Sequence, residues 1–499
     1  MKVLHTTLLP IHELLLELDE ICEETYRFPT NAASKSKIVG YLGSLRDDLL
    51  AYVEYPYVDK VYRNSFYSFF STKHRDYDRD CIRVSLFENT ISKEHFRKPE
   101  LQTALSKAFL GFVVVRPTMP KLIGRSVISP TAFKRSRFAN CSVNIECSVN
   151  GVRLISSGFP HSSQDSETIK CAETTVWEIM EYYGNKYPDY SPVLPSIIIA
   201  ALSGESYERQ LPTKGLSVEE ISHALKVFGF GVIVYARSIY KEDLKRLFYT
   251  YVESGIPVIA AIKNNDVSHA VVAIGRTRVV DDKIEASPVS FVVQDQGRKI
   301  EILDVADADR EYVLVDDNFP PYQLAKYDDP TAYYGAGKFQ KCDLHAIVVP
   351  LYHRIYLEGS KARSLITNLL SYSFVTMFLP FERITLRMFL TTGRSFKHKI
   401  ALDPAIKEDV KEMFLSILLP KFVWVAELST PELYSRKMAF GVVVLDATES
   451  GGNGADSVIF VALPEHFFHV ERGKFVPIDF VMEPFSMHLS NLRGDNNNG

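Results

Sequence analysis

The chain has 499 residues, of which 46% are hydrophobic and 24% charged, so it predicts folded domains rather than disorder. A length this far beyond one ordinary domain predicts two or three of them. The net charge is −4, from 57 basic and 61 acidic residues, which excludes a large positive surplus for binding nucleic acid.

The six cysteines are sparse, and none forms the closely spaced pair typical of metal and redox motifs. We therefore expect free thiols in a reducing compartment, with no metal and no cofactor. The first residues do not resemble a signal peptide, because Pro10, His12 and Glu13 interrupt their apolar run. No stretch reaches the roughly 18 apolar residues of a membrane span. These features predict a cytoplasmic protein with no membrane partner.

In the first third of the chain, apolar residues at helical spacing predict helices over residues 10–26 and 36–53. The segment FLGFVVV at 109–115 predicts a buried strand, and Pro117 ends it. We expect residues 1–150 to form an α/β flanking domain.

A helix is predicted to begin at Cys171 in the middle region. Its apolar face comprises Ala172, Val176, Ile179, Met180 and Tyr183, and Gly184 with Asn185 ends it. Ser166 and Thr168 are candidate N-caps. The backbone N–H groups of a first helical turn favour a thiolate, which makes Cys171 a candidate nucleophile. An isolated cysteine is as often a buried structural thiol, so the local sequence alone does not decide.

Two polar residues add to this prediction. Gln164 lies shortly before the cysteine, where a side-chain amide can stabilise the oxyanion of a tetrahedral intermediate. His269 opens the second strand of a predicted hairpin, PVIAAI followed by HAVVAIG, which can carry a base to a thiolate across a cleft. Between them, Ser217 and Glu220 form a capping box that begins another helix.

A third feature is a predicted strand at 311–315 that ends in two acids and an amide. An acceptor at this strand end can hold the imidazole of His269 in its useful tautomer. Asp316 follows the strand directly and is the preferred candidate, while Asp317 and Asn318 remain alternatives. Acids at such positions also commonly begin turns.

Together, these residues resemble the bacteriocin-processing (double-glycine leader) peptidases of the papain-like cysteine peptidase superfamily. The similarity covers about residues 155–325 and is carried by Gln164, Asp165, Cys171, GLSVEEISHAL at 215–225, SGIPV at 254–258, SHAVVAIG at 268–275 and VDDNFPPY at 315–322. It implies thiolate attack on an amide carbonyl, with Cys171, His269 and Asp316 as the triad and Gln164 as the oxyanion donor.

The chain also departs from this family. Ala172 and Glu173 follow the cysteine where the family usually has Gly-Pro, and Gln164 is one residue further from the cysteine than usual. The membrane segment and ATPase motifs of the transporter members do not occur here, so export of a leader peptide is not implied.

A second histidine, His345, also precedes a strand, and Cys342 lies three residues before it. We prefer His269 as the base because a strand that ends in acids follows it.

We therefore expect an α+β protein with a papain-like catalytic domain at 151–355, in which the helix bearing Cys171 packs on an antiparallel sheet bearing His269 and Asp316. Residues 356–499 form a further α+β domain. The expected function is a cysteine peptidase or amidase that acts on a peptide or protein substrate through an acyl-enzyme. The alternatives are an interaction or sensor protein without turnover, and an acyltransferase or deamidase that uses the same triad.

Overall fold

The structure is a computed structural model. It describes residues 3–26, 32–72, 77–118, 123–164, 171–203, 217–278, 284–295, 297–449, 454–471 and 474–494.

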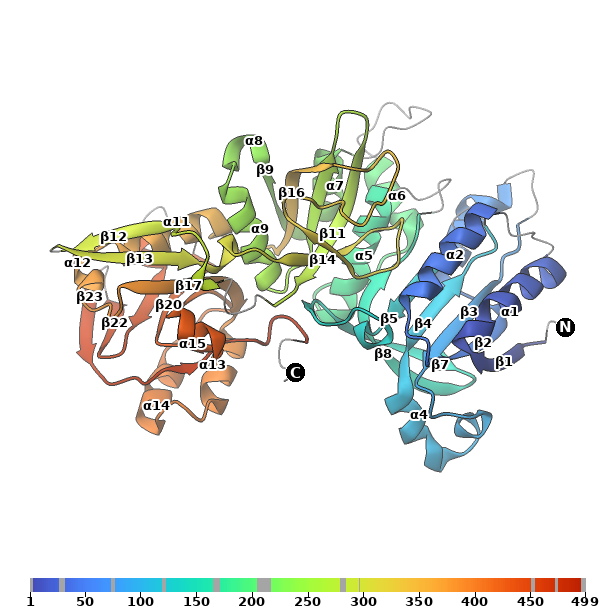
Figure 1. Ribbon diagram of the computed structural model, residues 1–499, viewed down its shortest axis with the longest axis horizontal. Helices are drawn as coiled ribbons and strands as arrows, with labels where there is room; N and C mark the ends of the chain where they lie inside the picture. The colour runs from blue at the N-terminus through green and yellow to red at the C-terminus, as the bar shows by residue number, and fades with distance from the viewer. Residues whose placement is uncertain are drawn as a thin grey trace.

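Three large sheets follow one another along the longest axis of the molecule, in the order in which the chain forms most of their strands (Figure 1). Helices and sheets are mixed throughout, and the strand pairs are antiparallel apart from β13–β17, the one parallel pair among the described strands. The expectation of an α+β protein is confirmed at this level. None of the described helices is long and apolar enough to cross a membrane.

The first sheet has the strand order β1-β2-β3-β4-β5-β8-β7. Its strands are β1 (His5–Pro10), β2 (Leu50–Tyr57), β3 (Cys81–Phe87), β4 (Phe109–Val115), β5 (Ile123–Ile128), β7 (Val143–Val149) and β8 (Val152–His161), and its helices are α1 (Leu14–Glu20), α2 (Ala32–Ser44), α3 (Lys60–Ser68) and α4 (Gln102–Ala108). The predicted strand at 109–115 is present, but the predicted helix over 36–53 ends at Ser44. The apolar run that follows fits either period, and pairing with β1 and β3 makes it strand β2.

The second sheet has the order β15-β14-β11-β10-β16-β9, and the short strand β6 pairs with the end of β11. Its strands are β6 (Ala139–Asn140), β9 (Phe230–Ala236), β10 (Val258–Lys263), β11 (Ser268–Arg276), β14 (Glu311–Val315), β15 (Gln323–Lys326) and β16 (Asp343–Tyr352), and its helices are α5 (Cys171–Lys186), α6 (Pro195–Ser203), α7 (Val218–Val227), α8 (Arg237–Tyr240) and α9 (Asp243–Glu253).

Helices cover both faces of this second sheet. Val272 and Ile274 belong to the same core as Val176 of α5, whereas Val271 shares a core with Leu247 of α9. Both faces of β10 and β11 are therefore buried, which explains why the sequence shows them as unbroken apolar runs rather than alternating ones.

The third sheet has the order β12-β13-β17-β18-β20-β21-β22-β23. Its strands are β12 (Phe291–Asp295), β13 (Arg298–Asp304), β17 (Arg383–Thr392), β18 (Phe422–Ser429), β20 (Gly441–Asp446), β21 (Val458–Ala462), β22 (His466–Glu471) and β23 (Lys474–Asp479); β19 (Met438–Ala439) pairs with β24 (Phe485–Ser486) apart from it. Its helices are α11 (Gly359–Leu370), α12 (Ser373–Thr376), α13 (Gly393–Leu402), α14 (Glu408–Ser416) and α15 (Pro431–Ser435).

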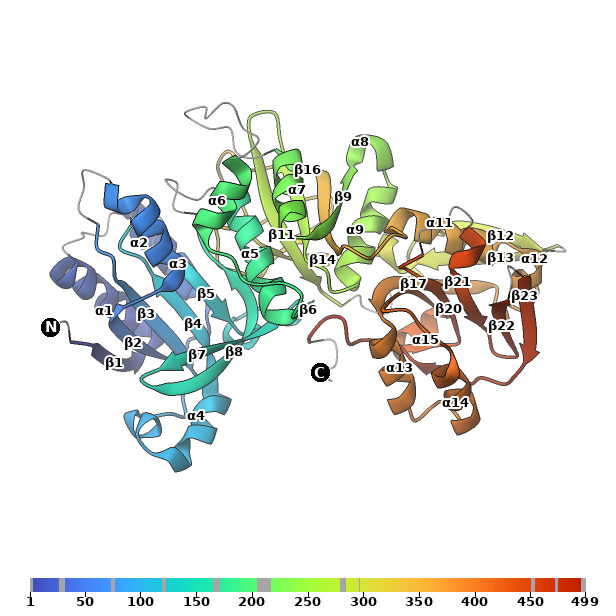
Figure 2. The ribbon, with the colours of Figure 1, turned by 180° about the vertical axis from the view of Figure 1, so that it is seen from behind.

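Two of the sheets contain strands from both sides of the domain boundaries expected from the sequence. Strand β8 extends the first sheet to His161, beyond residue 150, and β12 and β13 join the third sheet although they precede residue 355. The chain also returns at its end, because Arg493 exchanges backbone hydrogen bonds with Asn140. Figure 2 shows the second sheet between the other two, with strands and helices of both neighbours beside it.

Candidate active site

The predicted nucleophile stands at the start of a helix. Helix α5 begins at Cys171, whose side chain is partly exposed, and Thr175 Oγ1 donates to the Cys171 carbonyl at 2.7 Å. The apolar face predicted from the sequence is buried as expected. The candidate N-caps Ser166 and Thr168 lie outside the described residues, as does Asp165.

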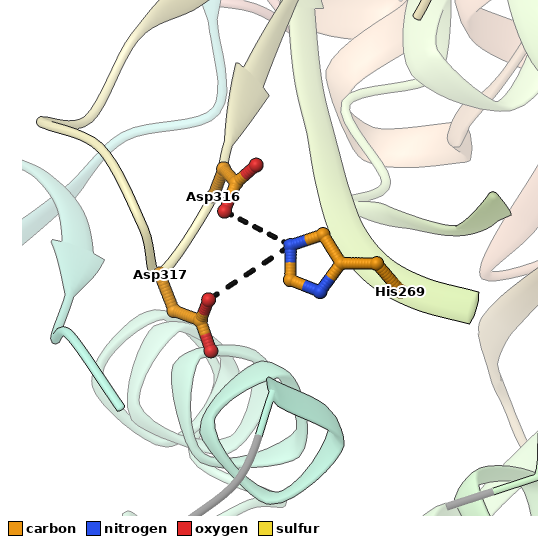
Figure 3. A group of neighbouring side chains, drawn as sticks. All are labelled: His269, Asp316 and Asp317. Atoms are coloured by element: carbon orange, nitrogen blue, oxygen red, sulfur yellow. Dashed lines mark hydrogen bonds and ion pairs between the residues drawn. The ribbon is translucent and has the colours of Figure 1, made fainter. Parts of the chain in front are cut away.

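The predicted base and acid are in direct contact. His269 Nε2 lies 2.9 Å from Asp316 Oδ1 (Figure 3). The pairing of β11 with β14 explains this contact: Val272 is opposite Val315, and the same register places Asp316 diagonally across from His269. Both side chains are buried, with 1% and 0% of their surfaces exposed.

The two alternative acceptors lie in the same group. Asp317 Oδ1 is 3.8 Å from His269 Nε2, and Asn318 Nδ2 is 3.4 Å from the same nitrogen (Figure 3 shows the two acids). The 2.9 Å contact makes Asp316 the hydrogen-bond partner of the imidazole, with Asp317 at ion-pair distance. Asn318 also donates to Asp316 Oδ1 from its backbone N–H, at 2.9 Å.

Electrostatics strengthen the contact between His269 and Asp316. Burial raises the pKa of the Asp316 carboxyl, but the charge of His269 and its hydrogen bond outweigh burial and bring the pKa down to about 2. For His269, burial lowers the pKa, and the charge and hydrogen bond of Asp316 overcome this and hold it well above its usual range. The pair is therefore stabilised as imidazolium and carboxylate.

Cys171 reaches this pair through the imidazole. A side-chain hydrogen bond between Cys171 and His269 is among the interactions that raise the pKa of the histidine. Because Nε2 faces Asp316, Nδ1 is the ring nitrogen left to face the sulfur. The order of contacts is thus thiol, imidazole and carboxylate.

Gln164 lies on the acid side of the imidazole. Its Nε2 donates to Asp317 Oδ1 at 3.3 Å and to Asn318 Oδ1 at 3.2 Å. Both amide hydrogens are engaged, so an oxyanion would have to compete for one of them. The sequence predicts a donor beside the nucleophile; the structure shows this amide donating to the two residues after Asp316.

Two tyrosines that no sequence pattern marks complete the surroundings of the acid. Tyr333 and Tyr334 donate from their hydroxyls to Asp316 Oδ2, at 3.0 and 2.7 Å. They belong to the segment between β15 and β16, in which Phe339 packs its ring 4.9 Å from that of His269. Asn264 fixes this segment by donating to the Lys338 carbonyl at 2.9 Å.

Glu178 is a further buried carboxyl near the site. It lies two turns after Cys171 on α5, accepts from Ser162 N at 3.4 Å, and has its pKa raised well above the usual range by burial and then by the charge of Asp317. An acid at i+7 from Cys171 interrupts the buried face of an apolar helix, and that interruption is the sequence signal that was missed.

The N-terminal region also borders the acids. Burial lowers the pKa of the Lys37 ammonium on α2, and the charges of Asp317 and Asp316 oppose this effect. One turn along α2, the ring of Tyr41 lies 6.3 Å from that of His161, whose Nε2 is 3.4 Å from the Asp316 carbonyl. Burial lowers the pKa of His161 to about 4, which keeps it neutral.

Cys342 and His345, the competing pair, lie in different environments. Cys342 is buried, with a pKa raised by burial and lowered in part by the charge of His269, whereas His345 is partly exposed on β16. Cys342 is thus near the same imidazole as Cys171, and any experiment on Cys171 needs it as a control.

One group among the described residues has side chains placed to hold a metal ion. The donor atoms of His269, Asp316 and Asp317 lie within 4.8 Å of one another. Asp316 already accepts hydrogen bonds from His269, the Asn318 backbone and two tyrosines, so both of its oxygens are engaged by donors. This environment suits a hydrogen-bonded carboxylate better than a metal ligand.

Comparison of the chain with protein-family models and with curated proteins found no match.

Proposed function

We propose that this protein is a cysteine-dependent hydrolase, a peptidase or amidase, with a papain-like arrangement of Cys171, His269 and Asp316. The observation that carries the proposal is the 2.9 Å contact between His269 Nε2 and Asp316 Oδ1, in an imidazole that is also hydrogen-bonded to Cys171. A nucleophile, a base and an orienting acid in contact are the arrangement that nucleophilic catalysis needs.

The chemistry follows from these contacts. Cys171 Sγ, as a thiolate, attacks the carbonyl carbon of an amide, and the proton of the thiol resides on His269 Nδ1. His269 gives that proton to the leaving nitrogen, the C–N bond breaks, and a thioester with Cys171 forms. Water then gives a proton to His269 and attacks the thioester, which releases the acid and restores the thiol.

Asp316 supports both proton transfers by holding the charged imidazole. Its carboxylate stays ionised because its pKa is about 2, and the tyrosine hydroxyls fix its orientation. The developing oxyanion would be stabilised by the backbone N–H of Cys171 in the first turn of α5, and by Gln164 once it releases Asp317 or Asn318.

A substrate can approach the site from the side of Cys171. His269 is covered by Phe339 and its side chain is 1% exposed, while Cys171 retains partial exposure. An acyl group therefore reaches the sulfur without displacing the acid side of the site, and a peptide or protein segment is the proposed substrate.

Alkylation of Cys171 by iodoacetamide tests the proposal, with the modified residue identified by mass spectrometry of peptides. We expect rapid labelling in the wild type, no labelling at this position in Cys171→Ala, and much slower labelling in His269→Ala. Cys342→Ala is the matched control and should leave the rate at Cys171 unchanged. Equal rates at Cys171 in the wild type and His269→Ala would contradict the proposed pair.

A trapped intermediate separates hydrolysis from binding without turnover. A peptide thioester or activated ester should acylate Cys171, and the acyl group should leave at a measurable rate in water. A stable acyl group would favour transfer to another acceptor, and no acylation would favour an interaction or sensor protein.

The second candidate is a divalent metal site at His269, Asp316 and Asp317, because their donor atoms lie within 4.8 Å. Calorimetric titration of the full chain with Zn²⁺ tests it. Tight binding that is lost in Asp317→Asn would favour this candidate, whereas the hydrolase proposal expects labelling of Cys171 that a chelator does not change.

A further inference from the structure

A second cavity lies far from Cys171, at the other end of the same helix. It has a volume of about 210 Å³, opens to solvent, and is lined by the end of α5, by β16 and β17 and by the start of α13. Its lining residues from α5 begin at Tyr183, three turns and about 18 Å along the helix from Cys171. The proposed catalytic residues do not line it.

The wall of this cavity is aromatic and apolar. Tyr352 and Phe422 lie on one side with ring centroids 5.0 Å apart, and Tyr183, Ile256 and Pro350 extend the apolar surface. Partly exposed flat rings at the wall of a cavity favour a ligand with a planar ring that stacks on them.

A cation without an anionic partner stands at the rim. Lys186 Nζ lies 4.8 Å from the ring centroid of Tyr182 and 5.5 Å from that of Tyr187, and it donates to the Tyr182 hydroxyl. Among the described residues no carboxylate lies within ion-pair distance of Lys186. Lys421, whose Nζ lies 4.1 Å from the ring centroid of Tyr352, is by contrast paired with Asp189 at 3.3 Å.

Hydroxyl groups line the same cavity from α13 and from the segment after β24. Ser395 and Ser490 line the cavity with their Oγ atoms 3.1 Å apart, and Ser490 Oγ lies 2.8 Å from His488 Nε2. Hydroxyls rotate to suit a partner, so they can donate to the acidic group of a ligand. The site thus combines a flat apolar wall, one unpaired positive charge and adaptable donors.

We propose that this cavity binds a small planar aromatic anion, with its ring against Tyr352 and Phe422 and its acidic group on Lys186. The proposal does not depend on the hydrolase, because its residues are separate from the proposed catalytic group. An occupant would contact both the helix that carries Cys171 and the sheet of the C-terminal region.

The test compares two probes of the same ring and nearly the same shape, naphthalene-2-carboxylate and the uncharged naphthalene-2-carboxamide, in calorimetric titrations of the full chain. We expect the carboxylate to bind about tenfold or more tightly than the amide, since hydrogen bonds to charged groups contribute a factor of this order. Lys186→Met keeps the apolar stem of the side chain and should reduce carboxylate binding to the level of the amide. Equal binding of the two probes by the wild type, or no binding, overturns the proposal.

Lys226→Met is the matched control, because Lys226 is also in the last turn of a helix but lies outside the cavity. It should leave binding of both probes unchanged. Tyr187→Ala is a second test that removes an exposed ring at the rim, and it should weaken both probes about three- to tenfold through lost aromatic contact. Carboxylate binding that is unchanged in Lys186→Met, or equally weakened in Lys226→Met, contradicts the assignment of Lys186.

Discussion

Two groups of buried charged side chains in this protein differ in how their charges balance. Glu253, Arg276, Arg387 and Glu427 form an ion network with two charges of each sign, whereas His269 faces Asp316 and Asp317 with Glu178 beside them. The first group joins α9 and β11 to β17 and β18; the second surrounds one imidazole and leads to a thiol.

The balance of positive and negative charge distinguishes the ion network, to which we assign a structural role, from the group around His269, to which we assign a chemical one. In the ion network, Arg387 contacts Glu253 and Glu427, and Arg276 closes the other side of Glu253 at 2.5 Å. Each charged side chain of this network is paired with one of opposite charge. Burial first, and then the charge of Asp317, raises the pKa of Glu178 well above its usual range; burial lowers the pKa of His269, but the charges of Asp316 and Asp317 outweigh it and hold that pKa well above its usual range. Such shifts are typical of sites that move protons.

The largest expected effect is on the rate of chemistry at Cys171. In Asp316→Asn the side chain keeps its shape but loses the charge that holds the imidazolium, and we expect labelling of Cys171 to fall by about 10² to 10⁴-fold. Asp317→Asn is the matched variant and should have a much smaller effect, because Asp317 lies 3.8 Å rather than 2.9 Å from His269 Nε2. The measurement is the second-order rate constant with iodoacetamide. A larger loss in Asp317→Asn would transfer the role of the acid to that residue.

The ion network should respond in stability and not in chemistry. Glu253→Gln removes the carboxylate that pairs with both Arg276 and Arg387, and of the network's carboxylates only Glu427 is left, paired with Arg387. We expect the free energy of unfolding to fall by about 3–5 kcal/mol. Glu94→Gln is the control, since it breaks an exposed pair with Lys98 and should cost about 0.5 kcal/mol or less. Unfolding by urea measures both, and labelling of Cys171 should be unchanged in folded Glu253→Gln. Similar losses in the two variants would mean that the network does not tie the two regions together.

The pH dependence of stability sharpens the same comparison. The pKa of Asp316 is about 2 in the folded state, below its usual value of about 3.9, so its contribution is present above pH 4 and is lost as the pH falls towards 2. His269 acts in the opposite sense: its raised pKa stabilises the fold below about pH 6.5, and this is lost at higher pH. The difference in unfolding free energy between wild type and Asp316→Asn should therefore shrink by about 2 kcal/mol from pH 4 to pH 2. A constant difference over that range would contradict the lowered pKa.

The site illustrates how far the sequence alone reaches. The start of α5 at Cys171, the strand that His269 opens and the strand that ends before Asp316 are each marked by local periodicity, so all three were predicted. Their contact depends on which strands pair and on where α5 packs, which the resemblance to papain-like peptidases implied and no local pattern shows. Tyr333 and Tyr334 lie in a segment without periodicity, where nothing local shows that its hydroxyls reach Asp316.

The assignment of strands to sheets is likewise not visible in the local sequence. A strand is recognised from its own residues, but its partner is chosen by long-range packing. Strand β13 pairs with β17 across a separation of about 80 residues, and β8 closes on β5 and β7 rather than on the sheet that follows. Each of the expected divisions, at residues 150 and 355, therefore falls between strands that share one sheet.

The smallest expected effect concerns the tyrosines that hold Asp316. Tyr334→Phe removes a 2.7 Å hydrogen bond to Asp316 Oδ2 and a partner of Asn318, while Tyr333→Phe removes a 3.0 Å bond alone. With one donor fewer, the carboxylate is less firmly oriented and its pKa rises, and we expect labelling of Cys171 to slow about threefold to tenfold in Tyr334→Phe and less in Tyr333→Phe. The acid limb of the rate against pH should also move upward, which a loss of packing alone would not cause. An unchanged pH profile together with a lower melting temperature would show that the tyrosines only support the fold, and the distinction between the two charged groups would then rest on His269 and Asp316 alone.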